Sequence, residues 1–257
     1  MNKMHNKKAL SVLKGVAVAL FWLAVWWVLA LAVNKQLLLP SPLEVGERFC
    51  ALIVQGEFWV ITVSSLLRVL AGFALGMVVG LAMAILMHKS KIIFALFSPF
   101  IKAVRATPVA SFIILALVWI RTNTLPAFIA FLMVFPVLYT NLLQGIRAAD
   151  RNLLEMADVF RLSPSRRVRC IFLPALRGPL FAACRVALGL CWKAGVAAEV
   201  IGVVARSVGG KLYDAKAYLE IADLFAWTVV IVAVSALFER VFLFLLGKIF
   251  DALEHAV

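Results

Sequence analysis

Long apolar runs alternate with short polar segments along the whole chain. A run of about 20 apolar residues is long enough to cross a bilayer as a helix. Such a segment must be helical because lipid offers no hydrogen-bond partners to an open backbone. The sequence therefore predicts an all-α polytopic membrane protein with about six transmembrane helices, a single domain over residues 1–257. The expected spans cover about residues 9–33, 64–87, 92–120, 127–144, 180–204 and 221–246.

The longest polar break covers residues 145–179, and its pattern is not that of a formless loop. Leu153, Ala157 and Phe160 fall on one side at helical spacing. Ser163 before Pro164 suits a helix start, because a serine hydroxyl can accept an unpaired amide and proline is tolerated in the first turn. We expect two short amphipathic helices at an elbow between two spans, a shape suited to docking onto another protein. The break is rich in arginine: Arg147, Arg151, Arg161, Arg166, Arg167, Arg169 and Arg177.

The composition is that of a membrane protein, and the positive net charge is consistent with this class. The chain is 65% hydrophobic and 15% charged, whereas a soluble domain is about half apolar and a quarter charged. The net charge of +13 does not require nucleic acid as a partner, because cytoplasmic loops of membrane proteins collect lysine and arginine. Placing residues 145–179 in the cytoplasm puts most basic residues on that side. Six spans then place both termini in the cytoplasm.

Small residues repeat along the second predicted span. Gly72, Gly76 and Gly80 lie four residues apart, so they fall on one face of a helix. Glycines at this spacing let another helix approach closely. The neighbouring helix could belong to the same chain or to a second copy, and the sequence leaves both alternatives open.

No constellation for bond chemistry is visible in the sequence. It has no phosphate-binding loop, no G-x-S-x-G and no H-E-x-x-H, so we expect no enzyme activity and no metal or cofactor bound by this chain. Carboxylates within or near the spans are Glu199, Asp223 and Glu239. Buried ionisable groups in membranes point to function by default, and Glu199 is interpreted as either a hydrogen-bond hub or part of a transport pathway. Lys102 and Arg105 lie near a span end, where snorkelling explains them.

The elbow carries a pattern that resembles a known motif. Glu155, Ala157, Ile171, Leu173 and Pro174 match the "EAA" loop of permease subunits of binding-protein-dependent ABC importers, which reads E-A-A, a glycine at the seventh position and later I-x-L-P. Three further stretches resemble the nitrate, sulfonate and taurine branch of that family. They are LPSP at 39–42, SLLRVLAGF at 65–73, and Trp192 followed by Ala197, Ala198 and Glu199. The resemblance covers about residues 39–245.

The resemblance implies a type I ABC importer permease-like fold in the bacterial cytoplasmic (inner) membrane. Two permease chains would form a pathway for a small solute such as a sulfonate-, nitrate- or taurine-like anion or another small metabolite. A homodimer is expected, and a heterodimer is the alternative that the sequence leaves open. An extracytoplasmic binding protein would deliver the solute, and cytoplasmic ABC ATPase subunits would use ATP and Mg. These ATPases would contact a cytoplasmic coupling loop comprising Glu155, Ala157, Asp158, Phe160, Arg161, Leu162, Ser163, Ile171, Leu173 and Pro174.

The alternative function is an ion-coupled secondary transporter. That class would show broken helices in two corresponding halves of the chain and coordinating groups near the middle of the membrane. Pro99, Pro108 and Pro136 interrupt two spans, but no matching half is apparent in the sequence.

The sequence departs from the family pattern at two positions of the elbow. Met156 replaces the second motif residue, and Arg161 stands where the family has glycine. Glycine adopts a left-handed conformation freely, whereas arginine there is less stable by roughly 1 kcal/mol or more. Two hypotheses follow. The elbow geometry differs from that of the family, or Arg161 pairs with an acidic groove on a specialised ATPase partner.

Overall fold

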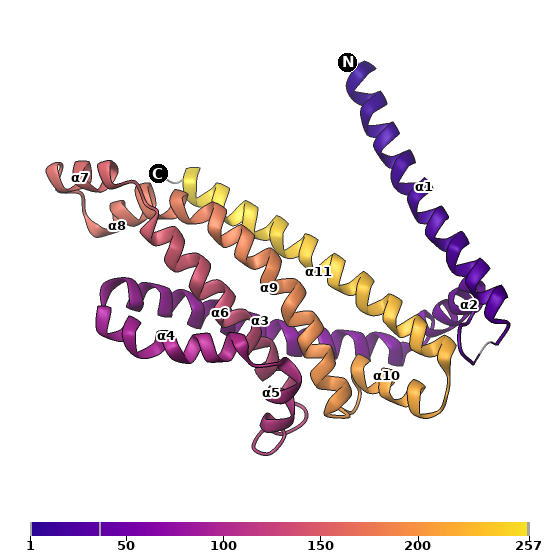
Figure 1. The fold of residues 1–257 in the computed structure, drawn as a ribbon. Coiled ribbons are helices and arrows are strands. Elements are labelled where there is room, and N and C mark those ends of the chain that lie inside the picture. Colours follow the sequence, from indigo (N-terminus) through magenta and orange to yellow (C-terminus); the bar gives the residue numbers. More distant parts are fainter. Residues whose placement is uncertain (1, 36, 256–257) are drawn as a thin grey trace. The chain divides into compact units, whose positions relative to one another are not determined.

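The computed structural model describes residues 2–35 and 37–255, and over this range it contains helices and no strand. The all-α prediction is therefore confirmed. The helices in chain order (Figure 1) are α1 (Asn2–Val33), α2 (Pro42–Ile53), α3 (Gly56–Lys89), α4 (Lys91–Ala106), α5 (Val109–Ala116), α6 (Leu125–Arg147), α7 (Arg151–Val159), α8 (Pro164–Arg167), a π-helical turn η1 (Val168–Phe172), α9 (Leu173–Ile201), α10 (Val208–Ala217) and α11 (Ile221–His255).

Helices of membrane-spanning length and hydropathy account for five of the expected spans. Within the described residues they are Lys14–Val33, Gly56–Lys89, Leu125–Arg147, Pro164–Ile201 and Ile221–Leu253. The segment expected as a third span, 92–120, is divided into α4 and α5, which are bent by 102° and together are apolar and long enough to count as a sixth, broken span. The bend follows Thr107, whose extended ψ of 132° is the conformation that a following proline favours. Pro99, by contrast, lies inside α4 without ending it.

The chain divides into two compact units, of which the first contains Met1–Trp59 and Lys211–Val230. Aromatic residues tie its helices together: Trp26 stacks on Phe225 and donates a 3.2 Å hydrogen bond to the Pro40 carbonyl. Ser41 and Glu44 form a reciprocal capping box that starts α2. The expected connector between the first two spans is therefore partly helical.

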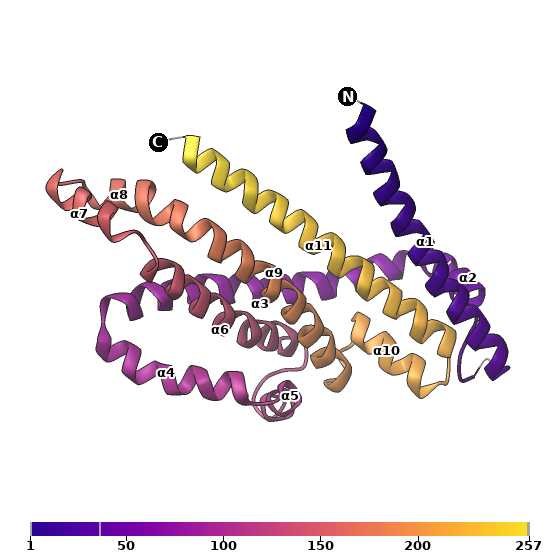
Figure 2. The same cartoon turned by 45° about the horizontal axis from the view of Figure 1, so that its top comes forward.

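The second unit contains Val60–Gly210 and Ile231–Val257. Its core is built on α6 and α9, which lie side by side in both views (Figures 1 and 2). Leu138 and Leu142 of α6 and Leu188 and Trp192 of α9 are buried. The Trp192 indole N–H donates a 3.0 Å hydrogen bond to the Ile231 carbonyl of α11, so a polar atom in the core is satisfied within the chain.

The glycine stripe of α3 faces α6. A Cβ added at Gly72 would lie 2.1 Å from the Ala127 carbonyl oxygen, and one at Gly76 would lie 2.7 Å from the Val134 Cβ. At Gly80 the nearest atom would be the Leu138 Cβ at 3.0 Å. The two backbones thus approach more closely than any larger residue would allow, and the stripe packs against a helix of the same chain.

We expect Gly72→Ala to lower the thermal unfolding midpoint of the purified protein in detergent. Forcing a methyl group into this contact overpacks the interface, which destabilises proteins by about 1–3 kcal/mol. Gly189→Ala is the matched control, because nothing lies within 4 Å of a Cβ added to that helical glycine. An unchanged midpoint for Gly72→Ala would contradict the close packing of α3 on α6.

Candidate functional site

The arginine-rich elbow joins α6 to α9 and extends beyond the ends of both helices (Figures 1 and 2). The first expected short helix is α7, and its N-cap Asp150 accepts a 2.8 Å hydrogen bond from the Asn152 amide. The second expected helix is not separate, because α8, η1 and α9 follow one another without a loop. The π-helical turn ends at Phe172, two residues before Pro174, which cannot donate a hydrogen bond to the preceding turn.

Arg161 adopts the left-handed conformation at the end of α7, with φ of 50°. The Leu162 amide donates to the Ala157 carbonyl at 2.9 Å, and the Arg161 amide donates to the Asp158 carbonyl at 3.1 Å. This pair of bonds is a Schellman motif, whose left-handed position is usually glycine. The left-handed turn is therefore present although arginine replaces the glycine of the family pattern.

Arg167 holds the two arms of the elbow together. Its Nη2 lies 2.6 Å from Asp158 Oδ1, and its guanidinium donates to the carbonyls of Ala157 at 3.3 Å and Leu162 at 3.2 Å. A cation at a helix C-terminus satisfies free carbonyls and interacts favourably with the helix dipole. Ser163 is the N-cap residue of α8 and Pro164 lies in its first turn, so the expected helix start is confirmed. The expected hydrogen bond from its side chain was wrong, because the Ser163 hydroxyl makes no capping bond and lies 3.3 Å from the Ser165 hydroxyl.

The elbow has a buried side and an exposed apolar side. Ala157 and Ile171 are buried, whereas Val159 is 79% and Phe160 71% exposed. Leu173 and Pro174 open α9, and Glu155 pairs with Arg151 at 3.2 Å on the exposed side of α7. Exposed apolar residues that are grouped together mark an interaction surface. The sequence pattern placed Ala157 and Phe160 on one side, but the structure places them on opposite sides because the helix ends between them.

Glu199 is fully buried on α9 and is the centre of a hydrogen-bond network. Its carboxylate accepts hydrogen bonds from Ser65 Oγ at 2.9 Å and from the Gly209 amide at 3.0 Å, and it lies 3.4 Å from Arg68 Nη1. Ser65 and Arg68 both belong to α3. The network therefore joins two spanning helices to the segment that follows α9.

The same network caps the start of α10. The Val208 amide donates to Ser65 Oγ at 2.9 Å and the Gly210 amide to Ser207 Oγ at 2.8 Å, while the Gly209 amide is bound by Glu199. Three amides that would be unpaired at a helix N-terminus are thus satisfied. Gly209 permits this approach, because an added Cβ would lie 2.3 Å from the Glu199 Cβ.

The other two carboxylates near the spans also pair with arginine. Asp223 binds Arg48 through both of its oxygens, and Glu239 lies 3.9 Å from Arg185. Donation to Asp223 raises the pKa of Arg48 above its ordinary value. In the part of the chain that the structure describes, no group of three or more His, Cys, Asp or Glu side chains gathers to hold a metal ion.

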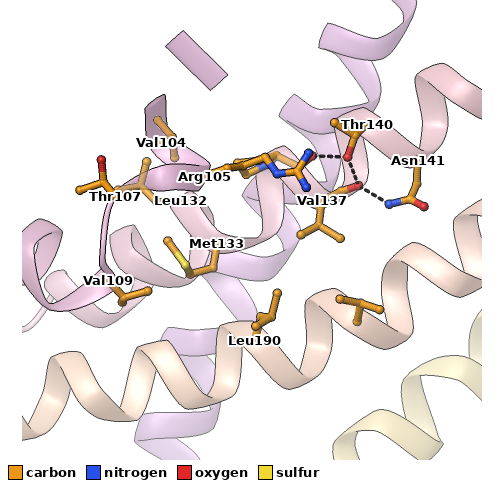
Figure 3. A pocket seen from close by; sticks show the side chains of 12 residues that line it. Val104, Arg105, Thr107, Val109, Leu132, Met133, Val137, Thr140, Asn141 and Leu190 are labelled. Atoms are coloured by element: carbon orange, nitrogen blue, oxygen red, sulfur yellow. Dashed lines mark hydrogen bonds between the residues drawn. The ribbon is translucent and has the colours of Figure 1, made fainter. Parts of the chain in front are cut away.

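Two adjoining cavities lie beside α6, and sequence reasoning missed both. The larger, of 410 Å³, is bounded by the α4–α5 bend, by α6 around Pro136 and by α9 (Figure 3). The smaller, of 230 Å³, lies between α4 and the Arg147 end of α6. Arg105 and Thr140 line both. The sequence did contain a signal for them: Lys102 and Arg105 lie within an apolar segment. The sequence analysis had explained these two cations by snorkelling.

We expect Glu199→Ala to destabilise the purified protein by about 3–5 kcal/mol, since removing one partner of a buried ion pair leaves the other uncompensated. Glu199→Gln should be milder, because its amide oxygen can still accept from the Gly209 amide. Glu239→Ala, which removes a more exposed carboxylate, should change stability by less than about 1 kcal/mol. Thermal unfolding in detergent measures all three, and equal effects of the two alanine variants would refute the central place of Glu199.

Comparison with known proteins places the chain among permeases. It is 28% identical over 240 residues to the putative aliphatic sulfonates transport permease protein SsuC of Bacillus subtilis, covering 92% of this chain and 86% of the relative. It is 28% identical over 250 residues to the bicarbonate transport system permease protein CmpB of Synechococcus elongatus, covering 93% and 89%. It is also 28% identical over 240 residues to the nitrate import permease protein NrtB of Synechocystis, covering 90% and 86%.

A solved structure shares the fold. A chain of the crystal structure titled "an amino acid ABC transporter with histidines" superposes with a TM-score of 0.55 at 19% identity, covering 76% of this chain and 91% of that one. The family described as "Binding-protein-dependent transport system inner membrane component" matches residues 76–253, more than half of the chain. With its apolar spans and type I permease fold, this multi-pass inner-membrane protein belongs to that family, the permease subunits of ABC importers.

Proposed function

We propose that this chain is the translocation subunit of an ATP-driven importer and that ATPase subunits dock on its elbow. The observation that carries the proposal is an elbow with an exposed apolar face, whose second arm continues without a loop into a spanning helix. Cytoplasmic ABC ATPases would bind Phe160 and its neighbours and would hydrolyse ATP with Mg. An extracytoplasmic binding protein would deliver the solute, and both termini would lie in the cytoplasm.

The elbow is suited to transmit movement because side-chain contacts join its two arms and its second arm continues as helix into α9. The Arg167 contacts with Asp158, Ala157 and Leu162 hold α7 against α8. Residues Pro164–Ile201 then continue as one helical segment. A force applied to α7 would therefore move α9 as a body, and α9 lines the larger cavity through Val186 and Leu190. ATP-driven movement of the partners would change the shape of that cavity.

The chain itself would carry no ATPase site, and its solute would be a small anion. The relatives named above are permeases for aliphatic sulfonates, bicarbonate and nitrate. These three solutes have in common that each is an oxyanion. A second copy of the same chain would complete the pathway, as in a homodimer. Membrane lipid would cover the exposed apolar residues of the spans.

Affinity purification of the tagged chain from native membranes tests the proposal. We expect a stoichiometric ATPase with a phosphate-binding loop to co-purify, together with a secreted binding protein under mild conditions. A chain that purifies alone and drives uptake into vesicles on an ion gradient without ATP would overturn the proposal in favour of the secondary transporter.

We predict that Phe160→Asp abolishes co-purification of the ATPase, because it places a charge in an apolar contact. Tyr218→Asp is the matched control: it alters an aromatic side chain that is 76% exposed, close to the 71% of Phe160, but lies outside the elbow. The yield of ATPase per permease is the measurement. Equal loss in both variants would indicate a general defect and would argue against docking at the elbow.

Arg161→Gly separates two roles of the elbow arginine. Relief of the left-handed strain should stabilise the protein by about 1 kcal/mol, visible as a small rise in the unfolding midpoint. If Arg161 also pairs with an acidic groove on the ATPase, the same variant should lower solute-stimulated ATPase activity. Unchanged stimulation would remove support for the acidic groove while leaving the docking proposal intact.

A further inference from the structure

The two cavities beside α6 are lined by cations and by no carboxylate. Lys102, Arg105 and Arg147 line them, together with hydroxyl and amide side chains, and neither lining contains Asp or Glu. Arg105 contributes to both cavities. Three positive charges in so small a space repel one another unless an anion accompanies them.

The neighbouring protein groups do not supply that anion. Among the described residues, neither Lys102 nor Arg105 lies within ion-pair distance of a carboxylate, and Arg147 lies 4.9 Å from the ring centre of Phe94. Glu199, Asp223 and Glu239 each pair with a different arginine. Lys102, Arg105 and Arg147 have exposed side chains, so their charges are available to a ligand. Snorkelling alone does not explain why three cations line adjoining cavities.

The larger cavity has a polar side and an apolar side. Arg105 points toward Thr140 in Figure 3, and Asn141 lies beyond it on α6. Thr140 Oγ donates to the Pro136 carbonyl at 2.7 Å and Asn141 Nδ2 to the Val137 carbonyl at 2.8 Å, which fixes both side chains. The second N–H of the Asn141 amide and the five of the Arg105 guanidinium can serve a ligand. Met133, Val186 and Leu190 form the apolar side.

We propose that Arg105, with Lys102, binds the oxyanion head of a small organic anion whose short apolar tail contacts Met133, Val186 and Leu190. A guanidinium binds planar or tetrahedral oxyanions through two parallel hydrogen bonds. The cavity volume of 410 Å³ is within the usual range for small-molecule sites, about 300–1,000 Å³. This inference rests on the proposed transport function and names the class of solute and the residues that would hold it.

The experiment measures equilibrium binding of radiolabelled butanesulfonate to the complex, purified without the binding protein and placed in phosphatidylcholine nanodiscs at constant ionic strength. We expect saturable binding that nitrate displaces more weakly than unlabelled butanesulfonate does. Arg105→Gln should weaken binding roughly 10- to 100-fold, the usual effect of losing a charge-assisted hydrogen-bond pair. Arg105→Lys should retain more affinity than Arg105→Gln, and the exposed Arg121→Gln is the matched control.

Several results would overturn the inference. The wild type could fail to bind butanesulfonate, or Arg105→Gln could bind it as tightly as the wild type does. Nitrate could also displace radiolabelled butanesulfonate as well as unlabelled butanesulfonate does. If Arg105→Gln does not fold, Lys102→Gln replaces it, with a smaller expected loss. A lipid phosphate would offer the same chemistry, so a second set of nanodiscs contains phosphatidylglycerol. Loss of butanesulfonate binding there would assign the site to a lipid headgroup instead.

The ATPase content of each preparation separates this inference from the proposed function. A preparation that retains its ATPase but binds no butanesulfonate refutes the anion site alone. A preparation without ATPase that still binds butanesulfonate through Arg105 refutes the importer and retains the site.

Discussion

The absence of water at membrane depth is the constraint on which this structure depends. A polar group there must find its partner within the protein, because lipid supplies none. Glu199 meets this constraint with Ser65, Arg68 and the Gly209 amide, and Trp192 meets it at the Ile231 carbonyl. These bonds run between helices, so satisfying single polar atoms also fixes how the spanning helices of the second unit are arranged.

Close helix contact follows from the same constraint, since lipid gives helices no hydrophobic reason to associate. Packing must supply the attraction, and small residues allow it. Gly195 of α9 brings that helix against Val69 of α3, where an added Cβ would lie 2.6 Å from a Val69 methyl, and Gly72 does the same for α3 and α6. Helices in such contact move together, as a structure that transmits force from an elbow requires.

The parts of the fold that depend on local sequence could be predicted, and those that depend on distant partners could not. Hydropathy predicted the spans, although not the bend between α4 and α5. A different elbow geometry was one hypothesis for Arg161, but this residue adopts the left-handed conformation that glycine adopts freely. Helix α10 lies in a segment expected to be a plain connector, because its N-terminal amides are capped by Ser65 and Glu199 from other helices.

The arginines differ in the partners that they have within the protein, and this difference bears on the function of the larger cavity. Arg48, Arg68 and Arg185 pair with the carboxylates near the spans, while Arg167 satisfies backbone carbonyls at the elbow. Among the residues that the structure describes, Arg105 has neither kind of partner, although it borders a cavity against α6 and α9. Arg105 shares its two cavities with other cations and no carboxylate, so an anion from outside would find its charge available. Helix α9, which the elbow would move, forms the opposite wall of the larger cavity.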